Sequence, residues 1–384
     1  LDLFCGDVII YTNNLEDLYM SFSIMHIIIA KTWGGGEQYV YDVCAEMKNQ
    51  GITSYVVVDE KNFQFQKKYK EVANVLTANL YFAAGLLSVR KIAGWIEKYN
   101  IKILNCHSGH AMLLCMLIKK LSSVRLVMFK HNALPSKHDC YHNFQRRYVD
   151  AFICVSQLVY NLQTDTLSAL EKEKYYLIYN GINTKRFNKY KEKEFKSHGK
   201  YILGYAGRIA SDKGIEVIIE ALAVLRYKYD DLYLHIAGTD EKGYINVLRK
   251  LIGKLNLQDK VVFLGHIDDM EKFYRSIDVL VAPSVVKESF GLVLCEAIYC
   301  GLPVIATNSG AQREIITQKQ YGTVVDNLNA DSLAEAISET YKNKERNGSK
   351  GEIYISRNFN IEITAKKLIE VYEHLLKNNH RRLF

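Results

Sequence analysis

The sequence lacks the patterns that would place it in several common classes of protein. No apolar run is long enough to span a bilayer, and there is no Gly-Lys-Ser/Thr or Gly-x-Gly-x-x-Gly motif. P-loop and dinucleotide-binding functions therefore lose support. The eight cysteines are scattered, without a Cys-x-x-Cys pair or a histidine at zinc-finger spacing. This cysteine usage predicts a reduced, cytoplasmic protein rather than a disulfide-bonded or zinc-binding one.

Residues 1–24 lack the features of a signal peptide. They have no basic start, no clean apolar core and no small-residue cleavage site. We interpret them as an extension of doubtful structure. The segment from Met25 to Ala30 is instead typical of the first strand of a Rossmann-like domain.

From residue 25 onward, short apolar segments alternate with amphipathic segments of helical length. The length of 384 residues suggests two domains, and a hydrophobic content of 48% is enough for substantial cores. Strands are predicted at 27–30, 55–59, 101–106, 126–130, 151–155 and 176–179, and again at 201–206, 232–237, 261–264, 278–282 and 303–307. Helices are predicted between them, for example at 37–49, 88–99 and 112–121. Alternation of this kind predicts an α/β protein whose parallel sheets are covered by helices on both faces.

The domain boundaries follow from the same pattern. The lysine-rich stretch 183–200 separates the two sets of strands and is interpreted as a solvated linker. We predict one Rossmann-like domain at 25–185 and a second at 186–362, facing each other across a cleft, where ligands prefer to bind. Residues 363–384 carry a last helix beyond the second sheet.

The most informative motif is Glu-Ser-Phe-Gly-Leu at 288–292, followed by Glu296. It comes soon after a predicted strand, and open α/β sheets bind ligands at the carboxyl ends of their strands. The amides of 289–292 begin a short helix, and a helix N-terminus favours an anionic group such as phosphate. Glu288 and Glu296 could accept hydrogen bonds from sugar hydroxyls. Ordinary exposed glutamates on a strand–turn–helix unit are the alternative.

A second motif lies at 204–214, where a strand leads into a helix through a loop that contains Arg208 and Lys213. Arginine offers a planar fork to phosphate oxygens, and lysine offers a mobile point charge. Two solvated cations are the alternative, which is disfavoured because a cation at a helix start opposes the helix dipole. The loop therefore predicts a site for a shared anion.

Glycines and histidines gather at the strand ends of the first domain. A Gly-Gly-Gly run at 34–36 lies between the first strand and a helix, where it would permit close approach of a ligand or simply form a tight turn. His107, His110 and His131 follow two later strands and face the presumed cleft. A single histidine is usually structural, and no third ligand for a metal is evident.

Together these motifs resemble those of the family-four retaining glycosyltransferases, which have the two-domain GT-B architecture. The mark of that family is a Glu-x7-Glu pair with Phe-Gly between its members, matched here by Glu288 and Glu296. The resemblance extends from residue 25 to the C-terminus. It implies a GT-B fold whose last helix crosses back to the first domain. It also implies transfer of a glycosyl group from a nucleotide-diphosphate sugar to an acceptor hydroxyl, with retention at the anomeric carbon.

The resemblance gives roles to individual residues. Arg208 and Lys213 would neutralise the donor diphosphate, Glu288 would hold the hydroxyls of the donor sugar, and Glu296 would hold the nucleotide ribose. His131 matches the cleft histidine that contacts the donor sugar, and His107 is the second choice for that role. Further contacts with the donor are expected from Gly35, Gly36, Gly207, Ser289, Phe290, Gly291, Leu292 and Glu314, and peripheral ones from Asn180, Gly238 and Gly265. Two positions depart from the family pattern: Asn183 stands where Asp is usual, and Ala311 replaces a glycine.

The substrates expected from the resemblance need no cofactor. Because no Asp-x-Asp motif is present, no metal is expected, and the diphosphate charge would be met by Arg208, Lys213 and helix N-termini. A uridine diphosphate sugar is the commonest donor. The acceptor would be a polysaccharide or a lipid-linked molecule, as in surface polysaccharide, lipopolysaccharide or glycolipid synthesis, and nucleic acid is not expected as a partner.

The net charge of +8 is modest, but its distribution is uneven. Basic residues gather in the first domain at Lys119, Lys120, Arg125, Lys130, Lys137, Arg146 and Arg147, and again at Arg381 and Arg382. A solvated surface is one interpretation, and peripheral docking to the anionic inner face of the cell membrane is the other.

Two alternatives to a glycosyltransferase also stay open. The protein could be a non-catalytic GT-B partner subunit, or a sugar-nucleotide epimerase on the same fold.

Overall fold

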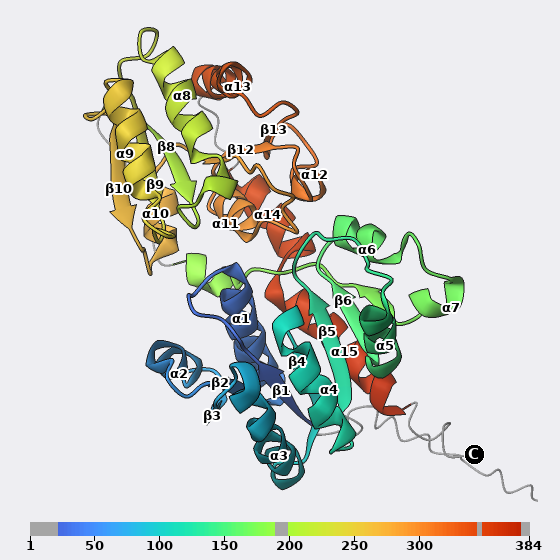
Figure 1. Cartoon of the computed structure of the whole chain (residues 1–384). Coiled ribbons are helices and arrows are strands. Elements are labelled where there is room, and N and C mark those ends of the chain that lie inside the picture. The colour runs from blue at the N-terminus through green and yellow to red at the C-terminus, as the bar shows by residue number, and fades with distance from the viewer. Residues whose placement is uncertain (1–21, 189–198, 344–347, 378–384) are drawn as a thin grey trace, which may run out of the picture.

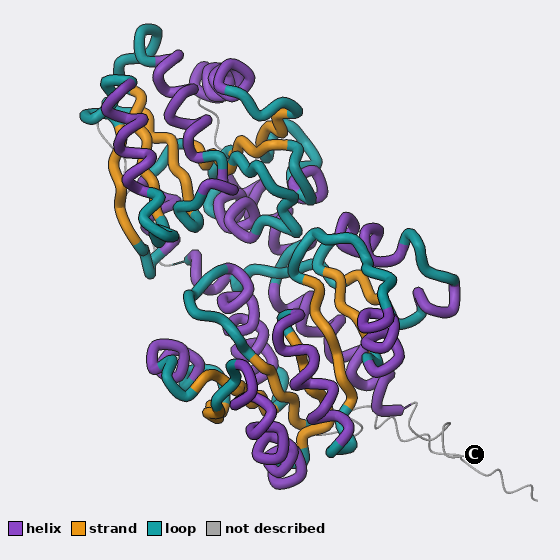
Figure 2. The backbone as a smooth tube through the Cα atoms, in the orientation of Figure 1, coloured by secondary structure: helices purple, strands orange, loops and turns teal. Residues whose placement is uncertain are grey.

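The computed structural model describes residues 22–188, 199–343 and 348–377, without the side chains of 82–86. Figure 1 shows two lobes, and Figure 2 shows that each lobe contains its own sheet with helices around it. All strand pairs within both sheets are parallel. The protein is therefore a two-domain α/β structure, as the sequence predicts.

The N-terminal sheet has seven strands in the order β3-β2-β1-β4-β5-β6-β7. Its strands are β1 (Ser23–Ile27), β2 (Thr53–Asp59), β3 (Asn74–Ala78), β4 (Ile101–Cys106), β5 (Arg125–Lys130), β6 (Ala151–Cys154) and β7 (Tyr175–Leu177). The helices of this part of the chain are α1 (Gly35–Asn49), α2 (Phe63–Tyr69), α3 (Phe82–Lys98), α4 (Met112–Lys120), α5 (Cys140–Tyr148), α6 (Gln157–Thr164) and α7 (Ala169–Lys172), with 3-10 turns η1 (Gly109–Ala111) and η2 (Thr184–Phe187). The order places β1, β4 and β5 side by side at the centre of the sheet.

The C-terminal sheet has six strands in the order β10-β9-β8-β11-β12-β13. Its strands are β8 (Tyr201–Ala206), β9 (Leu232–Ala237), β10 (Val261–Gly265), β11 (Val279–Ala282), β12 (Val304–Thr307) and β13 (Gly322–Val325). The helices of this part are η3 (Ser211–Lys213), α8 (Ile215–Leu225), α9 (Ile245–Lys254), α10 (Met270–Ser276), α11 (Leu292–Tyr299), α12 (Gln312–Ile315), α13 (Ala330–Asn343), α14 (Gly348–Asn358) and α15 (Ile361–Lys377). Strand β8 is buried along its whole length, as expected for a central parallel strand covered on both faces.

Two strands were not predicted from the sequence. β3 and β13 lie at sheet edges and are partly exposed, so their apolar patterns are weak. The first strand also begins at Ser23, earlier than the predicted start at Met25, and Phe22 before it is buried against Tyr372. Phe22, Ser23 and Ile24 are thus part of the fold, whereas 1–21 lie outside the described residues.

The last helix, α15, belongs to the N-terminal domain in space. Its buried residues Ala365, Leu368 and Tyr372 share a hydrophobic cluster with Tyr39 and Val43 of α1. Figure 1 shows α15 running along the N-terminal sheet, after α14 has packed on α11 in the other domain. The predicted crossing of this helix is confirmed, and it packs α15 beside α1 of the N-terminal domain.

Candidate functional site

Two neighbouring cavities lie between the domains. The larger, of about 470 Å³, has Trp33 on its N-terminal side and is called the Trp33 cavity here. The smaller, of about 270 Å³, is called the His131 cavity. Both are lined by Gly35, Gly207, Arg208 and Leu292, so they are two compartments of one cleft.

The loop between β8 and α8 brings two cations to this cleft, as predicted. Arg208 lines both cavities, and Lys213 lines the His131 cavity. The Arg208 guanidinium contacts the carboxylates of Glu241 and Asp212, the latter at 3.1 Å. Lys213 Nζ forms an ion pair with Glu288 Oε1. Each cation is therefore held in place by a carboxylate at the edge of the cleft.

Glu288 is held by backbone packing as well as by Lys213. Ser284 Oγ donates a hydrogen bond to Glu288 Oε1 at 3.0 Å, and the amide of Ala311 donates to the Glu288 carbonyl at 3.0 Å. Gly310 lies so close to the Glu288 backbone that a Cβ there would be 2.2 Å from the Glu288 oxygen. The glycine of the Gly310-Ala311 pair thus permits the packing that fixes the Glu288 loop.

Two helix N-termini face the His131 cavity. Helix α11 begins after Gly291, which has a φ of 116° that side chains rarely adopt, and residues 289–292 line the cavity. Helix α1 begins at the glycine run, and Gly35 and Gly36 line the same cavity. With Lys213 and Arg208, these amides give the cavity several hydrogen-bond donors that suit an anion.

Glu296 lines the Trp33 cavity from the next turns of α11, but its side chain is almost fully buried. The Tyr274 hydroxyl donates to its carboxylate at 2.7 Å, and Arg186 lies 3.8 Å away. Arg186 also contacts Asp42 of α1 at 3.3 Å, so it lies between carboxylates of the two domains. Burial raises the pKa of both carboxyls, and Arg186 opposes this effect. Arg186, Asp42 and Tyr274 were not predicted from the sequence, because no local motif joins them.

Two of the three predicted histidines, His107 and His131, lie together at the cleft, and His26 joins them in place of His110. His131 lines the His131 cavity, and His107 lies behind it, with His107 Nδ1 3.0 Å from His131 Nε2. His26 of β1 continues the series, with its Nδ1 2.9 Å from His107 Nε2. His110, by contrast, lies in η1 and lines neither cavity. Burial lowers the pKa of His26 to about 3 and that of His131 to about 4.

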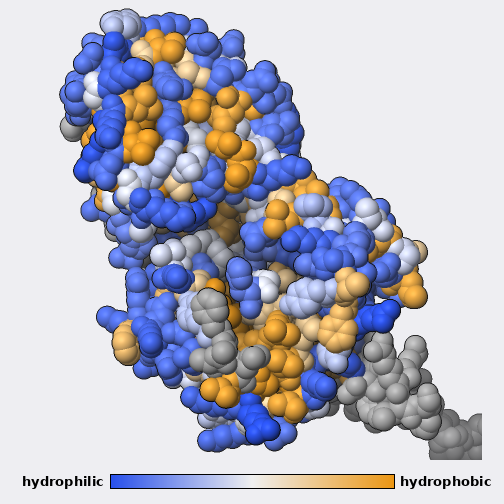
Figure 3. All heavy atoms as spheres, viewed as in Figure 1, coloured by the Kyte–Doolittle hydropathy of each residue, from blue (hydrophilic) through white to orange (hydrophobic). Residues whose placement is uncertain are grey.

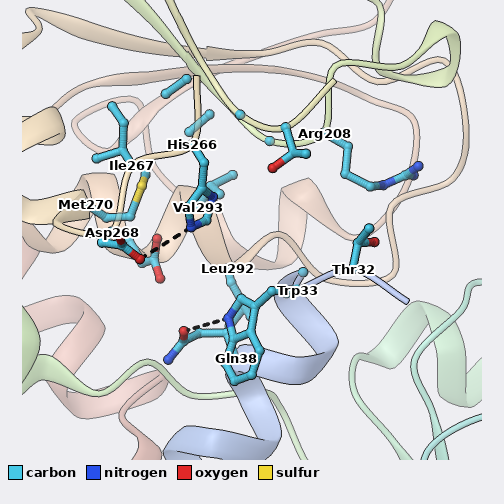
Figure 4. A pocket seen from close by; sticks show the side chains of 18 of the residues that line it. Thr32, Trp33, Gln38, Arg208, His266, Ile267, Asp268, Met270, Leu292 and Val293 are labelled. Carbon is cyan, nitrogen blue, oxygen red and sulfur yellow. Dashed lines mark hydrogen bonds and ion pairs between the residues drawn. The ribbon is translucent and has the colours of Figure 1, made fainter. Parts of the chain in front are cut away.

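The wall of the Trp33 cavity contains several residues that were not predicted. Figure 4 shows Trp33 and Gln38 on one side and His266, Ile267, Asp268 and Met270 on the other. Lys68 of α2 lies over the Trp33 ring and 4.0 Å from Asp268. The loop after β10 could have been found from the sequence, because it follows a predicted strand at the same edge of the sheet as the Glu288 loop.

The remaining predicted residues divide between the cleft and its surroundings. Asn180 lines the His131 cavity and Gly238 lines the Trp33 cavity, whereas Gly265 lines neither. Glu314 lies elsewhere: its carboxylate accepts hydrogen bonds from the amides of Gln157 and Leu158, both at 2.8 Å. It therefore caps helix α6 of the other domain instead of lining either cavity.

The basic residues of the N-terminal domain do not form one exposed surface. Lys119 and Arg125 both pair with Asp150, at 2.5 and 3.4 Å, and Arg146 lies 3.9 Å from Glu171. The exposed members of this group are Lys120, Lys137 and Arg147. Arg381 and Arg382 lie outside the described residues. None of the helices in the described ranges is long and apolar enough to cross a membrane.

Within the described parts of the chain, no three His, Cys, Asp or Glu side chains are placed to hold a metal ion together. The seven cysteines in these parts are free thiols. What the cleft offers is a compartment with two cations, two helix N-termini and the Glu288 carboxylate, joined to a larger compartment with an aromatic wall. Such an arrangement can bind a phosphorylated ligand and fix its hydroxyl groups.

Two family models match adjoining parts of the chain. A family model described as "Glycosyltransferase Family 4" matches residues 33–186, and one described as "Glycosyl transferases group 1" matches residues 186–357. The chain is 26% identical to the lipopolysaccharide core biosynthesis mannosyltransferase LpsB of Rhizobium meliloti, over 71% of this chain and 80% of LpsB. It is 28% identical to the phosphatidyl-myo-inositol mannosyltransferase of Mycobacterium leprae, over 78% of this chain and 80% of that protein.

Solved structures share the whole architecture. A glycosyltransferase from Rickettsia africae superposes with a TM-score of 0.80 at 22% identity, over 94% of this chain and 100% of its own. Anabaena HepE in complex with UDP-glucose superposes with a TM-score of 0.77 at 20% identity, over 92% and 99% of the two chains. These likenesses show a common two-domain fold.

Proposed function

Because the chain belongs to the family 4, group 1 glycosyltransferases of GT-B fold, we propose that it transfers a glycosyl group from a nucleotide-diphosphate sugar to an acceptor hydroxyl, with retention at the anomeric carbon. The observation that carries this proposal is the His131 cavity. Arg208, Lys213, Glu288 and two helix N-termini converge on it. A departing diphosphate needs this charge, and a transferred sugar needs an acceptor for its hydroxyls beside it.

The proposed chemistry rests on preorganised charge. Arg208, Lys213 and the amides at the start of α11 would stabilise the diphosphate as the bond to the sugar breaks. Lys213 would exchange its partner Glu288 for phosphate oxygens, which frees the Glu288 carboxylate to bind sugar hydroxyls. The acceptor hydroxyl would attack the anomeric carbon from the face on which the phosphate leaves. An oxygen of the leaving phosphate would take the proton of that hydroxyl. Holding the acceptor hydroxyl close to the anomeric carbon, on the face from which the phosphate leaves, supplies the remaining rate enhancement.

The nucleotide would occupy the Trp33 cavity. This compartment adjoins the two cations, has the aromatic ring of Trp33 on one wall, and contains Glu296, which we assign to the ribose hydroxyls. A uridine diphosphate sugar is our first candidate for the donor, since the structural neighbour HepE holds UDP-glucose. A mannosyl donor is the second, because two relatives are named as mannosyltransferases. No metal is required in this scheme, since side-chain cations meet the charge of the diphosphate.

Thermal stability in the presence of nucleotide sugars tests the proposal. UDP-glucose, UDP-galactose, UDP-N-acetylglucosamine and GDP-mannose should be compared, because a ligand that binds the native state at about 100 times its Kd adds roughly 2.7 kcal/mol of stability. The donor found in this way is then incubated with candidate acceptors, and NMR of the product gives the anomeric configuration. An inverted product would contradict the mechanism. Loss of activity in EDTA that Mn²⁺ or Mg²⁺ restores would contradict metal independence.

The same assay separates the two alternative functions. A non-catalytic partner subunit would bind a nucleotide sugar, if at all, without turnover under any condition. An epimerase would convert the donor in the absence of acceptor, so the donor should be recovered unchanged from reactions without acceptor. Transfer that requires an acceptor supports the glycosyltransferase.

For the acceptor we propose a lipid-linked molecule reached at an anionic membrane surface. Figure 3 shows hydrophobic side chains gathered on the N-terminal domain around α4. Leu113 of α4 and Phe144 of α5 are each 48% exposed, and Lys120 and Arg147 are exposed on the same two helices. These helices contact each other, so apolar and basic groups lie together. A basic residue near an anionic surface contributes about 1 kcal/mol.

Co-sedimentation with liposomes tests the membrane surface. Binding should require anionic lipid, decrease with salt, and weaken in the double variant Lys120→Glu/Arg147→Glu. Lys254→Glu, on an exposed position of the other domain, is the matched control and should bind as the wild type does. Equal binding to neutral liposomes, or no binding to anionic ones, would contradict the proposed membrane surface. The acceptor would then be a water-soluble molecule.

A further inference from the structure

Three histidines form a hydrogen-bonded series that runs from the core of the N-terminal domain to the cleft. His26 Nδ1 is 2.9 Å from His107 Nε2, and His107 Nδ1 is 3.0 Å from His131 Nε2. They come from β1 and from the carboxyl ends of β4 and β5, which are neighbouring strands. Of these three histidines, only His131 lines a cavity of the cleft.

Aromatic side chains leave these rings little freedom. Phe129 stacks on His107 with ring centroids 4.5 Å apart, and it lies nearly parallel to His131 at 5.7 Å. Tyr39 packs edge-on against His131 at 5.4 Å. These ring contacts restrict rotation of the imidazoles, and the two nitrogen–nitrogen contacts fix which ring nitrogens face each other.

The positions of the protons are linked along the series. A neutral imidazole has one N–H donor and one acceptor nitrogen, and burial keeps these rings neutral by lowering the pKa of each. Each nitrogen–nitrogen contact needs one donor and one acceptor. If His107 Nδ1–H donates to His131, then His107 Nε2 must accept from His26 Nδ1–H. The opposite order would place a proton on His26 Nε2.

His26, at the buried end of the series, decides between the two possible directions of the hydrogen bonds. His26 Nε2 is buried and has no hydrogen-bond partner among the described residues. A buried N–H without an acceptor is rare in folded proteins. Asn105, the register partner of His26 on β4, also has a buried side-chain group without a partner among the described residues, and this group, Nδ2, is a donor. Both facts favour a lone pair on His26 Nε2, so that the hydrogen bonds point outward and His131 carries its proton on Nδ1.

We propose that His26 and His107 are positioning residues that hold His131 in its Nδ1–H tautomer, so that a fixed hydrogen-bond donor faces the transferred sugar. Among the described residues, His131 Nδ1 shows no hydrogen bond, which leaves it available to a ligand. What His131 binds rests on the proposed function. The tautomer is a property of the ligand-free protein and can be tested without a substrate.

NMR of the full chain labelled with ¹⁵N-histidine tests the tautomer. Two-bond ¹H–¹⁵N spectra of the ligand-free protein should show His131 as the Nδ1–H form between pH 6 and 8. In His107→Phe, which keeps a ring beside Phe129 but cannot donate, His131 should lose its single tautomer. The resonances of His110 and His142, which lie in the same domain as His107 but outside the histidine series, report whether this variant is folded. An Nε2–H form of His131, or an unchanged Nδ1–H form in folded His107→Phe, would overturn the proposal.

A matched pair of amide variants gives a second test, independent of the spectra. His107→Asn places an N–H near the position of Nδ1 and should preserve the hydrogen bond to His131. His107→Gln places it near Nε2, on the side of His26, and should not. We expect His107→Gln to weaken binding of UDP-glucose or GDP-mannose about tenfold, with binding of UDP or GDP unchanged, and His107→Asn to stay within about twofold of the wild type. Equal losses in both variants, or a loss for the free nucleotide as well, would show a merely structural role. If no nucleotide sugar binds the wild type, the proposed function fails, and the spectra still decide the tautomer.

Discussion

At the scale of single residues, the cations of the cleft are already paired before a ligand binds. Arg208 contacts Asp212 and Glu241, and Lys213 contacts Glu288. The Arg208 pairs are exposed, and pairs of that kind contribute only about 0–1 kcal/mol, so a diphosphate can replace their carboxylates at little cost. The Lys213–Glu288 pair is partly buried, and phosphate oxygens would take the place of the Glu288 carboxylate. The pairs therefore hold the two cations in place without preventing binding.

The first prediction concerns these two cations. Arg208→Ala and Lys213→Ala should each lower kcat/KM by about 10²-fold or more, the scale of losing one group that stabilises developing charge. Melting temperatures should change little, because both side chains lie at the surface of the cleft. Steady-state kinetics with the identified donor measures the effect, and Lys254→Ala is the control. Near-normal turnover in both variants would remove these residues from the mechanism.

At the scale of structural elements, the Glu288 loop is positioned by a neighbouring turn. Gly310 packs on the backbone of Glu288, and the Ala311 amide donates to its carbonyl. Helix α11, which starts at the end of this loop, then carries Glu296 into the other compartment. The geometry of the two glutamates thus depends on β12 and the turn after it as much as on their own segment.

The second prediction tests this dependence. Gly310→Ala should displace the Glu288 loop, because its Cβ would lie 2.2 Å from the Glu288 oxygen and 2.6 Å from its nitrogen. We expect kcat/KM for the donor to fall by at least about tenfold and stability to fall by about 1–3 kcal/mol, as for other overpacked positions. Gly253→Ala in helix α9, where a Cβ would meet nothing within 4 Å, is the control and should not destabilise the protein. Equal activity of the two variants would contradict the prediction, because it would mean that the Glu288 loop accommodates the added Cβ.

At the scale of the whole molecule, buried charges join the two domains. Arg186 lies between Asp42 of the N-terminal domain and Glu296 of the C-terminal domain. Glu314 reaches from the C-terminal domain to the first amides of α6, and α15 returns to pack beside α1. The cleft therefore owes its shape to contacts that no single domain contains.

The third prediction concerns Arg186 and pH. Burial raises the pKa of Asp42 and Glu296, so above their ordinary range of about 4 the folded state binds more protons than the unfolded state, and stability falls as pH rises. Arg186 opposes this loss. Arg186→Met should therefore destabilise the protein by about 3 kcal/mol at pH 8, as when one partner of a buried pair is removed, and clearly less at pH 5. Urea unfolding at both pH values measures this change in the free energy of unfolding. The same loss at pH 5 and pH 8 would contradict the stabilisation of ionised Asp42 and Glu296 by Arg186.

The fourth prediction concerns Glu314, expected from the sequence near the nucleotide and found at the N-terminus of α6. Glu314→Gln loses the charge that suits a helix N-terminus and one of the two acceptor oxygens. We expect a loss of about 1–2 kcal/mol and a wider separation of the domains in small-angle X-ray scattering. Glu335→Gln, on the exposed side of α13, is the control. An unchanged scattering curve together with weaker nucleotide binding would restore the predicted role.

The sequence by itself determined the fold class and the parts of the site that lie within one loop. Central strands such as β4 and β8 were predicted at their observed bounds, because burial on both faces leaves a continuous apolar segment. Arg208 with Lys213, and Glu288 with 289–292, were predicted together because each set belongs to one strand–loop–helix connection. Such neighbours stay neighbours in any fold that keeps the connection.

Only the tertiary structure decided which distant residues meet. His26, His107 and His131 come together because β1, β4 and β5 are adjacent, an order that periodicity along the chain does not contain. Arg186 meets Asp42 and Glu296, and Glu314 meets α6, because the two domains pack in one particular orientation. The physical reason is the same in each case: apolar patterning specifies which face of an element is buried, whereas the partner of a buried polar group depends on strand order and domain packing.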